Sequence, residues 1–119
     1  MFQSEASMLH TGKAVKVIIY LSDGARHHGM PLYSSILDIL YKSGIAGATV
    51  VKGIAGFGYE HRMHSAALLD ISDFLPIVIS FIDTQEKVDE VLPEIQKSLT
   101  SGLIEVQDTT VCMPPRPSH

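Results

Sequence analysis

The sequence predicts an α+β domain with the ferredoxin-like βαββαβ order, a four-stranded antiparallel sheet carrying both helices on one face. Three observations support this prediction. Runs rich in β-branched residues alternate with amphipathic helical patterns in the order strand, helix, strand, strand, helix, strand. A length of 119 residues suits a single domain with its own core. The strands are apolar at nearly every position, so the sheet face without helices is expected to meet a partner, most simply another copy of the chain.

The first strand and helix have the clearest patterns. Val15–Leu21 is β-branched and aromatic, which is typical of a buried strand. Residues 22–29 form a polar loop, and Pro31 is expected to open the helix, because proline is favoured at the first helical position. Gly44 stands where a left-handed cap would end that helix. Its apolar residues recur at spacings of three and four: Leu32, Ile36, Ile39 and Leu40.

The second half of the chain repeats the pattern after a long irregular segment. Ala48–Lys52 is the second predicted strand and Ile77–Ile82 the third. Asp83 and Glu86 have capping-box spacing at the start of the second helix. The apolar stripe of this helix consists of Val88, Val91, Leu92, Ile95 and Leu99. The last strand, Leu103–Val111, alternates apolar and polar residues, so one of its faces is expected to be in water.

The ends of the chain differ from the middle. Residues 1–12 are small and polar and are expected to form a flexible arm. Residues 113–119 are proline-rich and cannot continue a central strand. The folded domain is therefore expected to span residues 13–112.

Composition excludes several functional classes. Nine Lys and Arg against 13 Asp and Glu give a net charge of −4, which argues against nucleic-acid binding. No apolar run reaches the roughly 20 residues needed to span a bilayer. The single cysteine, Cys112, excludes an intrachain disulfide and a cysteine-based zinc site. No signal peptide is recognisable. We expect a cytoplasmic protein that does not insert into membranes.

The main candidate site is a glycine-rich stretch after the second strand. Gly53, Gly56 and Gly58 would let backbone amides approach an anion or a ring closely. The stretch is neither a Walker loop nor a Rossmann fingerprint, and it is equally consistent with a bulge and turn. Lys52 and Arg62 bracket it, where a phosphate would need positive charge.

Histidines are the second candidate. His27 and His28 are adjacent in one loop, and His61 and His64 are three residues apart in another. Four imidazoles could bind a transition metal, but no accompanying carboxylate pattern exists, so exposed loop histidines are the favoured interpretation. No nucleophile is paired with a recognisable base, and an enzyme is therefore not expected.

Several motifs, in the right order, resemble those of the PII signal-transduction superfamily. These motifs are Lys52–Gly58, Asp73–Pro76 and Lys87–Val91. Two upstream segments and one histidine narrow the resemblance to the small PII-like family catalogued as a domain of unknown function: Gly29–Tyr33, Gly44–Val50 and His64. The resemblance covers about residues 13–112.

This resemblance implies a ferredoxin-like fold and a homotrimer, which would supply the partner for the uncovered sheet face. It also implies a small effector, an adenine nucleotide, bound in clefts between subunits. A mobile loop, Tyr59–Ser72 here, would signal to a target protein, often a transporter or an enzyme. Members of the superfamily are generally sensors rather than catalysts, as in nitrogen regulation.

Site residues follow from the resemblance position by position. Gly56, Phe57 and Gly58 match the loop-base motif that lines the nucleotide cleft, and Thr49 matches a strand position that contacts adenine. The remaining candidates meet a phosphate or order the loop: Lys52, Gly53, Arg62 and His64.

The second cleft loop departs from the superfamily pattern. It matches Gly102–Asp108, where Glu105 and Asp108 stand in place of glycines and a lysine. These acids imply AMP or ADP rather than ATP, because they would repel a triphosphate. The alternative is a metal-responsive trimer similar to divalent-cation-tolerance proteins, with the paired histidines as ligands.

Overall fold

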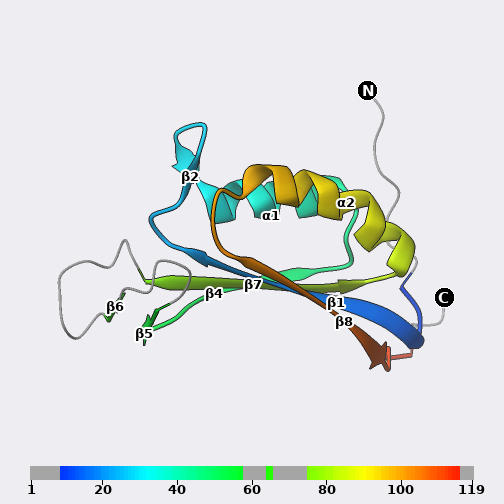
Figure 1. The fold of residues 1–119 in the computed structure, drawn as a ribbon. Coiled ribbons are helices and arrows are strands. Elements are labelled where there is room, and N and C mark those ends of the chain that lie inside the picture. The colour runs from blue at the N-terminus through cyan, green and yellow to red at the C-terminus, as the bar shows by residue number, and fades with distance from the viewer. Residues whose placement is uncertain (1–8, 58–63, 66–74, 116–119) are drawn as a thin grey trace.

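The computed structural model describes residues 9–57, 64–65 and 75–115, and it has the predicted element order. Four strands form one antiparallel sheet in the order β4-β7-β1-β8, and two helices lie on one face of it (Figure 1). The ferredoxin-like prediction is confirmed. The main elements are β1 (Gly12–Ser22), α1 (Leu32–Lys42), β4 (Ala48–Lys52), β7 (Pro76–Asp83), α2 (Gln85–Ser98) and β8 (Leu103–Val111).

Strand register determines which side chains meet the helices. Ile19 in the centre of β1 is opposite Ile79 on one side and Ile104 on the other. Because side chains alternate along a strand, these three lie on the same sheet face. The helices cover this face with the predicted apolar stripes, and the buried helical residues are Leu32, Ile36 and Leu40 from α1 and Val88, Val91 and Ile95 from α2.

The opposite sheet face has no helix over it in the described part of the chain (Figure 1). Ile18, Val78 and Ile82 lie there half-buried, and Val51 is 52% exposed. A sheet that is apolar on both faces is covered on one only, as the strand patterns predict. We call this surface the open face.

A pair of polar side chains lies at one side of the open face. The Tyr20 hydroxyl donates a hydrogen bond to Glu105 Oε1 at 3.0 Å. This hydrogen bond raises the pKa of the Tyr20 phenol, with smaller contributions from desolvation and from the glutamate charge. Tyr20 therefore stays neutral as a hydrogen-bond donor to Glu105 throughout the neutral pH range.

A short hairpin replaces the polar loop predicted between β1 and α1. Strands β2 (Arg26–His27) and β3 (Met30–Pro31) pair across a two-residue turn. His28 and Gly29 have φ angles of 52° and 81°, both in the left-handed region, as a type I′ turn requires. Pro31 therefore ends β3 and caps the helix, which begins at Leu32 rather than at the proline.

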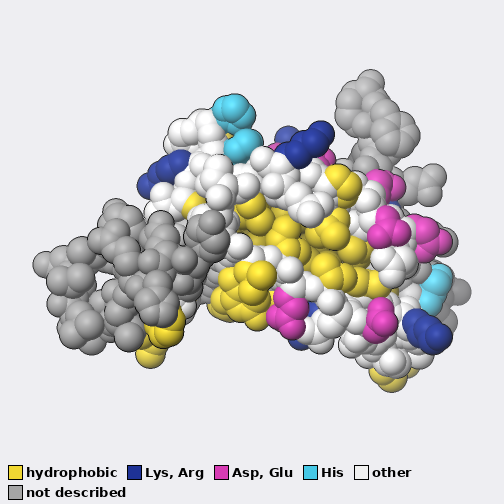
Figure 2. Space-filling view, viewed as in Figure 1, with side chains coloured by type: hydrophobic (Ala, Val, Ile, Leu, Met, Phe, Trp, Pro, Cys, Tyr) yellow, Lys and Arg dark blue, Asp and Glu magenta, His cyan; other side chains and the backbone are white. Residues whose placement is uncertain are grey.

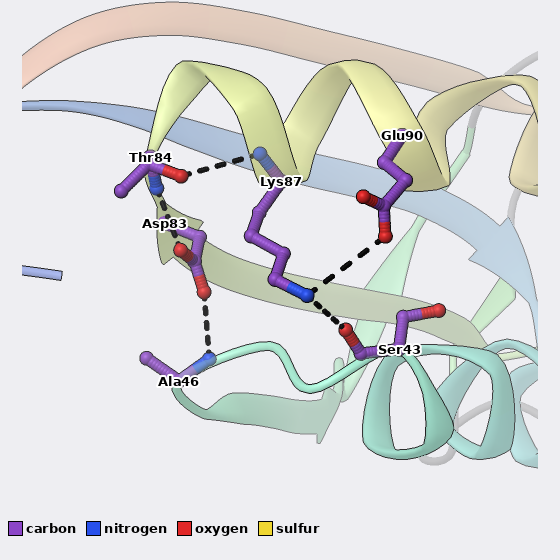
Figure 3. A network of polar contacts seen from close by, with 6 residues as sticks. All are labelled: Ser43, Ala46, Asp83, Thr84, Lys87 and Glu90. Atoms are coloured by element: carbon purple, nitrogen blue, oxygen red, sulfur yellow. Dashed lines mark hydrogen bonds and ion pairs between the residues drawn. The ribbon is translucent and has the colours of Figure 1, made fainter. Parts of the chain in front are cut away.

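The junction between β7 and α2 differs from the predicted capping box (Figure 3). Thr84 is the N-cap, and its hydroxyl accepts a hydrogen bond from Lys87 N at 3.2 Å. Asp83 instead ends β7 with its side chain fully buried on the helix side. Its Oδ1 accepts from Thr84 N at 2.7 Å and its Oδ2 accepts from Ala46 N at 2.8 Å. The carboxylate thus joins the α1–β4 connection to the start of α2.

Lys87 reinforces the same junction. Its Nζ donates to the carbonyl oxygen of Ser43 at 2.9 Å and lies 3.8 Å from Glu90 Oε1 (Figure 3). A cation at the last carbonyls of a helix also interacts favourably with the helix dipole. The polar network of Asp83, Thr84 and Lys87 therefore holds the end of α1 and the approach to β4 in place.

We expect Asp83→Ala to lower the free energy of unfolding by about 2–4 kcal/mol, because it strips the backbone amides of Ala46 and Thr84 of their acceptor. Urea unfolding followed by circular dichroism measures the loss.

Asp89→Ala is the control, since Asp89 accepts only an exposed hydrogen bond from Gln85 among the contacts described. Its effect should stay within about 0.5 kcal/mol. Equal losses in the two variants would mean that Asp83 does not hold the junction.

Candidate functional site

The candidate site lies where β4 ends, β7 begins and β1 ends. The amide of Gly53 donates to the carbonyl of Pro76 at 2.7 Å, and the amide of Asp23 donates to the carbonyl of Leu75 at 2.8 Å. Leu75 is almost fully buried, at 4% exposure. These hydrogen bonds bring the two chain positions that flank residues 58–74 to one end of the sheet. We call this end the loop base.

Two glycines of the predicted motif pack against one proline. A Cβ at Gly53 would lie 2.8 Å from Pro76 Cγ, and a Cβ at Gly56 would lie 3.3 Å from the same atom. The glycines are thus explained by close packing of β4 and its extension on the start of β7. The amide of Gly53 is used in the hydrogen bond to Pro76, and Gly56 lies in the short strand β5 (Ala55–Gly56), so a binding role for these glycines stays a prediction.

A second small sheet brings one of the predicted histidines to this place. Strand β5 (Ala55–Gly56) pairs with β6 (His64–Ser65), with Gly56 opposite His64. The backbone of His64 therefore lies beside the glycine stretch. Gly58 and Arg62, the other predicted residues nearby, lie outside the described residues.

Lys52 already has a carboxylate partner. Its Nζ lies 2.8 Å from Oδ2 of Asp23, whose side chain is 13% exposed whereas that of Lys52 is 46% exposed. Sequence analysis did not single out Asp23, because nothing in the sequence near it indicates a lysine 29 positions away. The one feature of the sequence that points to Asp23 as a site residue is its position directly after a buried strand.

Two exposed apolar side chains follow Lys52 in the chain. Ile54 is 83% exposed and Phe57 is 58% exposed. Hydrophobic surface is visible at this end of the molecule, beside the residues drawn in grey (Figure 2). An exposed aromatic ring within a few residues of a lysine offers a stacking surface and a cation, a combination that suits a planar, anionic ligand.

Thr49 does not join this cluster within one chain. It is opposite Ser80, on the open face, whereas Lys52 is three positions further along β4 and so lies on the other side of the strand. The structure therefore does not bring Thr49 and Lys52 together on one face of the sheet, and the role of Thr49 stays a prediction.

The second predicted cleft segment is not a loop. Residues 103–108 form the first part of β8 and pair with β1. Glu105 accepts hydrogen bonds from Tyr20 and, at 3.0 Å, from Gln107 Nε2. The strand predicted over Leu103–Val111 is confirmed, whereas the loop that the resemblance implies over Gly102–Asp108 is wrong because this stretch pairs with β1. Gly102 precedes it with φ of 108°, and a Cβ there would clash with the Tyr20 carbonyl.

The structure does not assemble a metal site from the histidines that it describes. His27 and His28 contact each other edge to face, with ring centroids 4.2 Å apart, in the hairpin above α1. Within residues 9–57, 64–65 and 75–115, no group of three or more His, Cys, Asp or Glu side chains is placed to hold a metal ion. His61 lies outside those residues. Neither of the helices described is long and apolar enough to cross a membrane.

The chain belongs to the DUF190 family, whose model, described as "Uncharacterized ACR", matches residues 14–111. It is 38% identical over 100 residues to a UPF0166 protein of Methanocaldococcus jannaschii, covering 83% of this chain and 92% of that protein. It is 34% identical over 93 residues to a UPF0166 protein of Aquifex aeolicus, covering 78% and 88%. The expected membership of a PII-like family of unknown function is confirmed.

Solved structures with the same fold include PII-like proteins. CPII of Thiomonas intermedia K12, bound to ADP and bicarbonate, superposes with a TM-score of 0.62 at 26% identity, covering 83% of this chain and 88% of CPII. The divalent ion tolerance protein CutA1 of Ehrlichia chaffeensis has a TM-score of 0.58 at 17% identity, covering 90% and 88%. The CutA1 likeness shows the fold alone.

We expect Gly53→Ala to destabilise the protein by about 1–3 kcal/mol, because the added methyl group meets Pro76 Cγ at 2.8 Å and pushes β4 away from β7. Thermal and urea denaturation measure this loss.

Gly47→Ala is the matched control, since a Cβ there meets nothing within 4 Å and its φ lies outside the left-handed region. This variant should be neutral or slightly more stable. A Gly53→Ala protein as stable as Gly47→Ala would contradict the packing argument.

Proposed function

We propose that the protein is a PII-like sensor that binds an adenine nucleotide, AMP or ADP, at the loop base and signals to a target protein. The observation that carries this proposal is the exposed ring of Phe57, which follows the half-exposed Lys52 by five residues at the loop base. CPII, 26% identical, supports the ligand class because it was crystallised with ADP and bicarbonate.

In this proposal each group at the loop base has a distinct role. Phe57 stacks against the adenine or walls off its pocket, and Lys52 attracts the phosphate. The packing of Gly53 and Gly56 on Pro76 sets the direction in which this segment leaves β4. Arg62 and His64 contribute to the phosphate or to the order of the segment. The role is that of a sensor and not of a catalyst.

Assembly supplies what the single chain lacks. We propose a homotrimer that buries the open face, since half-buried Ile18, Val78 and Ile82 form its apolar centre. Burying this surface contributes about 25 cal/mol for each Å² of apolar area removed from water. Thr49 lies on the same face, so a neighbouring subunit brings it into the cleft.

Signalling follows from a shift in populations. A ligand changes an equilibrium only by its difference in affinity for the two states. The proposed ligand favours one arrangement of residues 59–72, and that arrangement binds or releases a transporter or an enzyme.

We expect ADP and AMP at millimolar concentration to raise the melting temperature, because a ligand that binds the native state alone stabilises it. Phe57→Ala should weaken ADP binding about tenfold or more in calorimetric titration, through loss of stacking.

Tyr41→Ala is the control, since Tyr41 is 84% exposed on α1, away from the loop base. It should leave the affinity unchanged. Absence of any response to either nucleotide would refute the ligand assignment.

We expect light scattering to give a mass about three times 13.0 kDa. Val78→Asp should dissociate this assembly, because it places a charge at the apolar centre of the open face.

Leu37→Asp, at a side chain 37% exposed in the helix layer, should leave the mass unchanged. Circular dichroism confirms that both variants fold. A monomeric wild-type protein, or a trimeric Val78→Asp variant, would rule out the open face as the interface.

A further inference from the structure

The ion pair of Lys52 with Asp23 has consequences for any anion that approaches the loop base. We propose that Asp23 is a specificity-determining residue: by sharing the lysine, its carboxylate makes the site discriminate against ligands of higher negative charge. The inference rests on the proposed nucleotide site and adds to it a residue that neither the resemblance nor the sequence motifs include.

Burial keeps Asp23 at this position. The carboxylate is 13% exposed and its Oδ2 lies 2.8 Å from Lys52 Nζ, whereas the lysine side chain is 46% exposed. A ligand can therefore reach the ammonium from solvent, but the carboxylate cannot move into water without rearrangement of the chain around it. Removing its partner would leave a shielded charge unpaired, which is unfavourable. A phosphate must consequently share Lys52 with Asp23 instead of displacing it.

Sharing produces a repulsion that depends on ligand charge. Two like charges about 6 Å apart repel enough to weaken binding by about threefold for each unit of charge in bulk water and by up to about a hundredfold near a protein surface. ADP carries about one negative charge more than AMP at neutral pH, and adenosine carries none. The penalty from Asp23 is thus expected to be largest for ADP, smaller for AMP and zero for adenosine.

The main chain of Asp23 also contacts the loop base. Its amide donates to the carbonyl of Leu75 at 2.8 Å, and the next residue, Pro76, accepts from Gly53 at 2.7 Å. One residue thus contacts the end of β4 through its side chain and the start of β7 through its main chain. A phosphate that shares Lys52 with Asp23 therefore acts on a residue that contacts both chain positions flanking residues 58–74.

The test is calorimetric titration of the full-length chain with ADP, AMP and adenosine. Asp23→Asn, which keeps the shape of the side chain and its main-chain hydrogen bond, should tighten ADP about fivefold more than it tightens AMP and leave adenosine unchanged. Lys52→Gln should show the reverse order, with ADP weakened more than AMP and adenosine again unchanged. Asp23→Ser, which also removes the carboxylate charge, decides the question if Asp23→Asn does not fold.

The matched control is Asp38→Asn. Asp38 forms a similar ion pair, 2.9 Å from Lys42, on the exposed surface of α1. Its substitution should change none of the three affinities, which separates a local effect at Asp23 from a change in net charge.

The outcomes separate the two proposals. If Asp23→Asn changes all three affinities equally, Asp23 only supports the fold and the inference is wrong. If the wild-type protein binds none of the three ligands, the proposed function fails. The same variants titrated with inorganic phosphate and pyrophosphate then decide the role of Asp23. Selective tightening of pyrophosphate by Asp23→Asn supports it, and absence of binding by either anion overturns both.

Discussion

The structure depends on strict alternation of side chains along a sheet that is apolar on both faces. In β1, Val17 and Ile19 are inaccessible to solvent beneath the helices, whereas Ile18 between them is directed to the open face and is only half-buried. Two helices can cover one face of a four-stranded sheet and no more, so the composition that stabilises the domain also leaves an apolar surface. The proposed assembly would bury this uncovered apolar surface, and it needs no additional helix or strand to form the interface.

The same alternation organises the candidate site. Lys52 ends β4 on the helix side of the sheet, where it meets Asp23 at the end of β1 across the intervening start of β7. Thr49 is directed to the open face by the same rule. The proposed assembly would bring Thr49 to a ligand from a neighbouring chain. The edge strand β4 is held at both of its ends. Asp83, at the far end of β7, accepts from Ala46 just before β4, and Pro76 accepts from Gly53 just after β4.

At the loop base, the positive charge of Lys52 is paired with the negative charge of Asp23. A lysine with a shielded carboxylate at 2.8 Å presents little net charge to solvent, and the whole chain carries −4. Such a site favours ligands in which a planar ring contributes most of the affinity and the anion contributes less. This balance agrees with the preference for AMP or ADP, which was first inferred from Glu105 and Asp108. The structure places those acids on β8, and it is Asp23 that supplies the negative charge at the loop base.

The sequence by itself determined the element order, the core stripes of both helices, the uncovered sheet face and the family, because these depend on local periodicity and on contiguous motifs. Tertiary structure decided what depends on residues distant in the chain. It placed the buried carboxylate of Asp83 against Ala46 and brought Asp23 to Lys52. No local pattern encodes these contacts, since each arises from the register of strands that meet only after the sheet has formed.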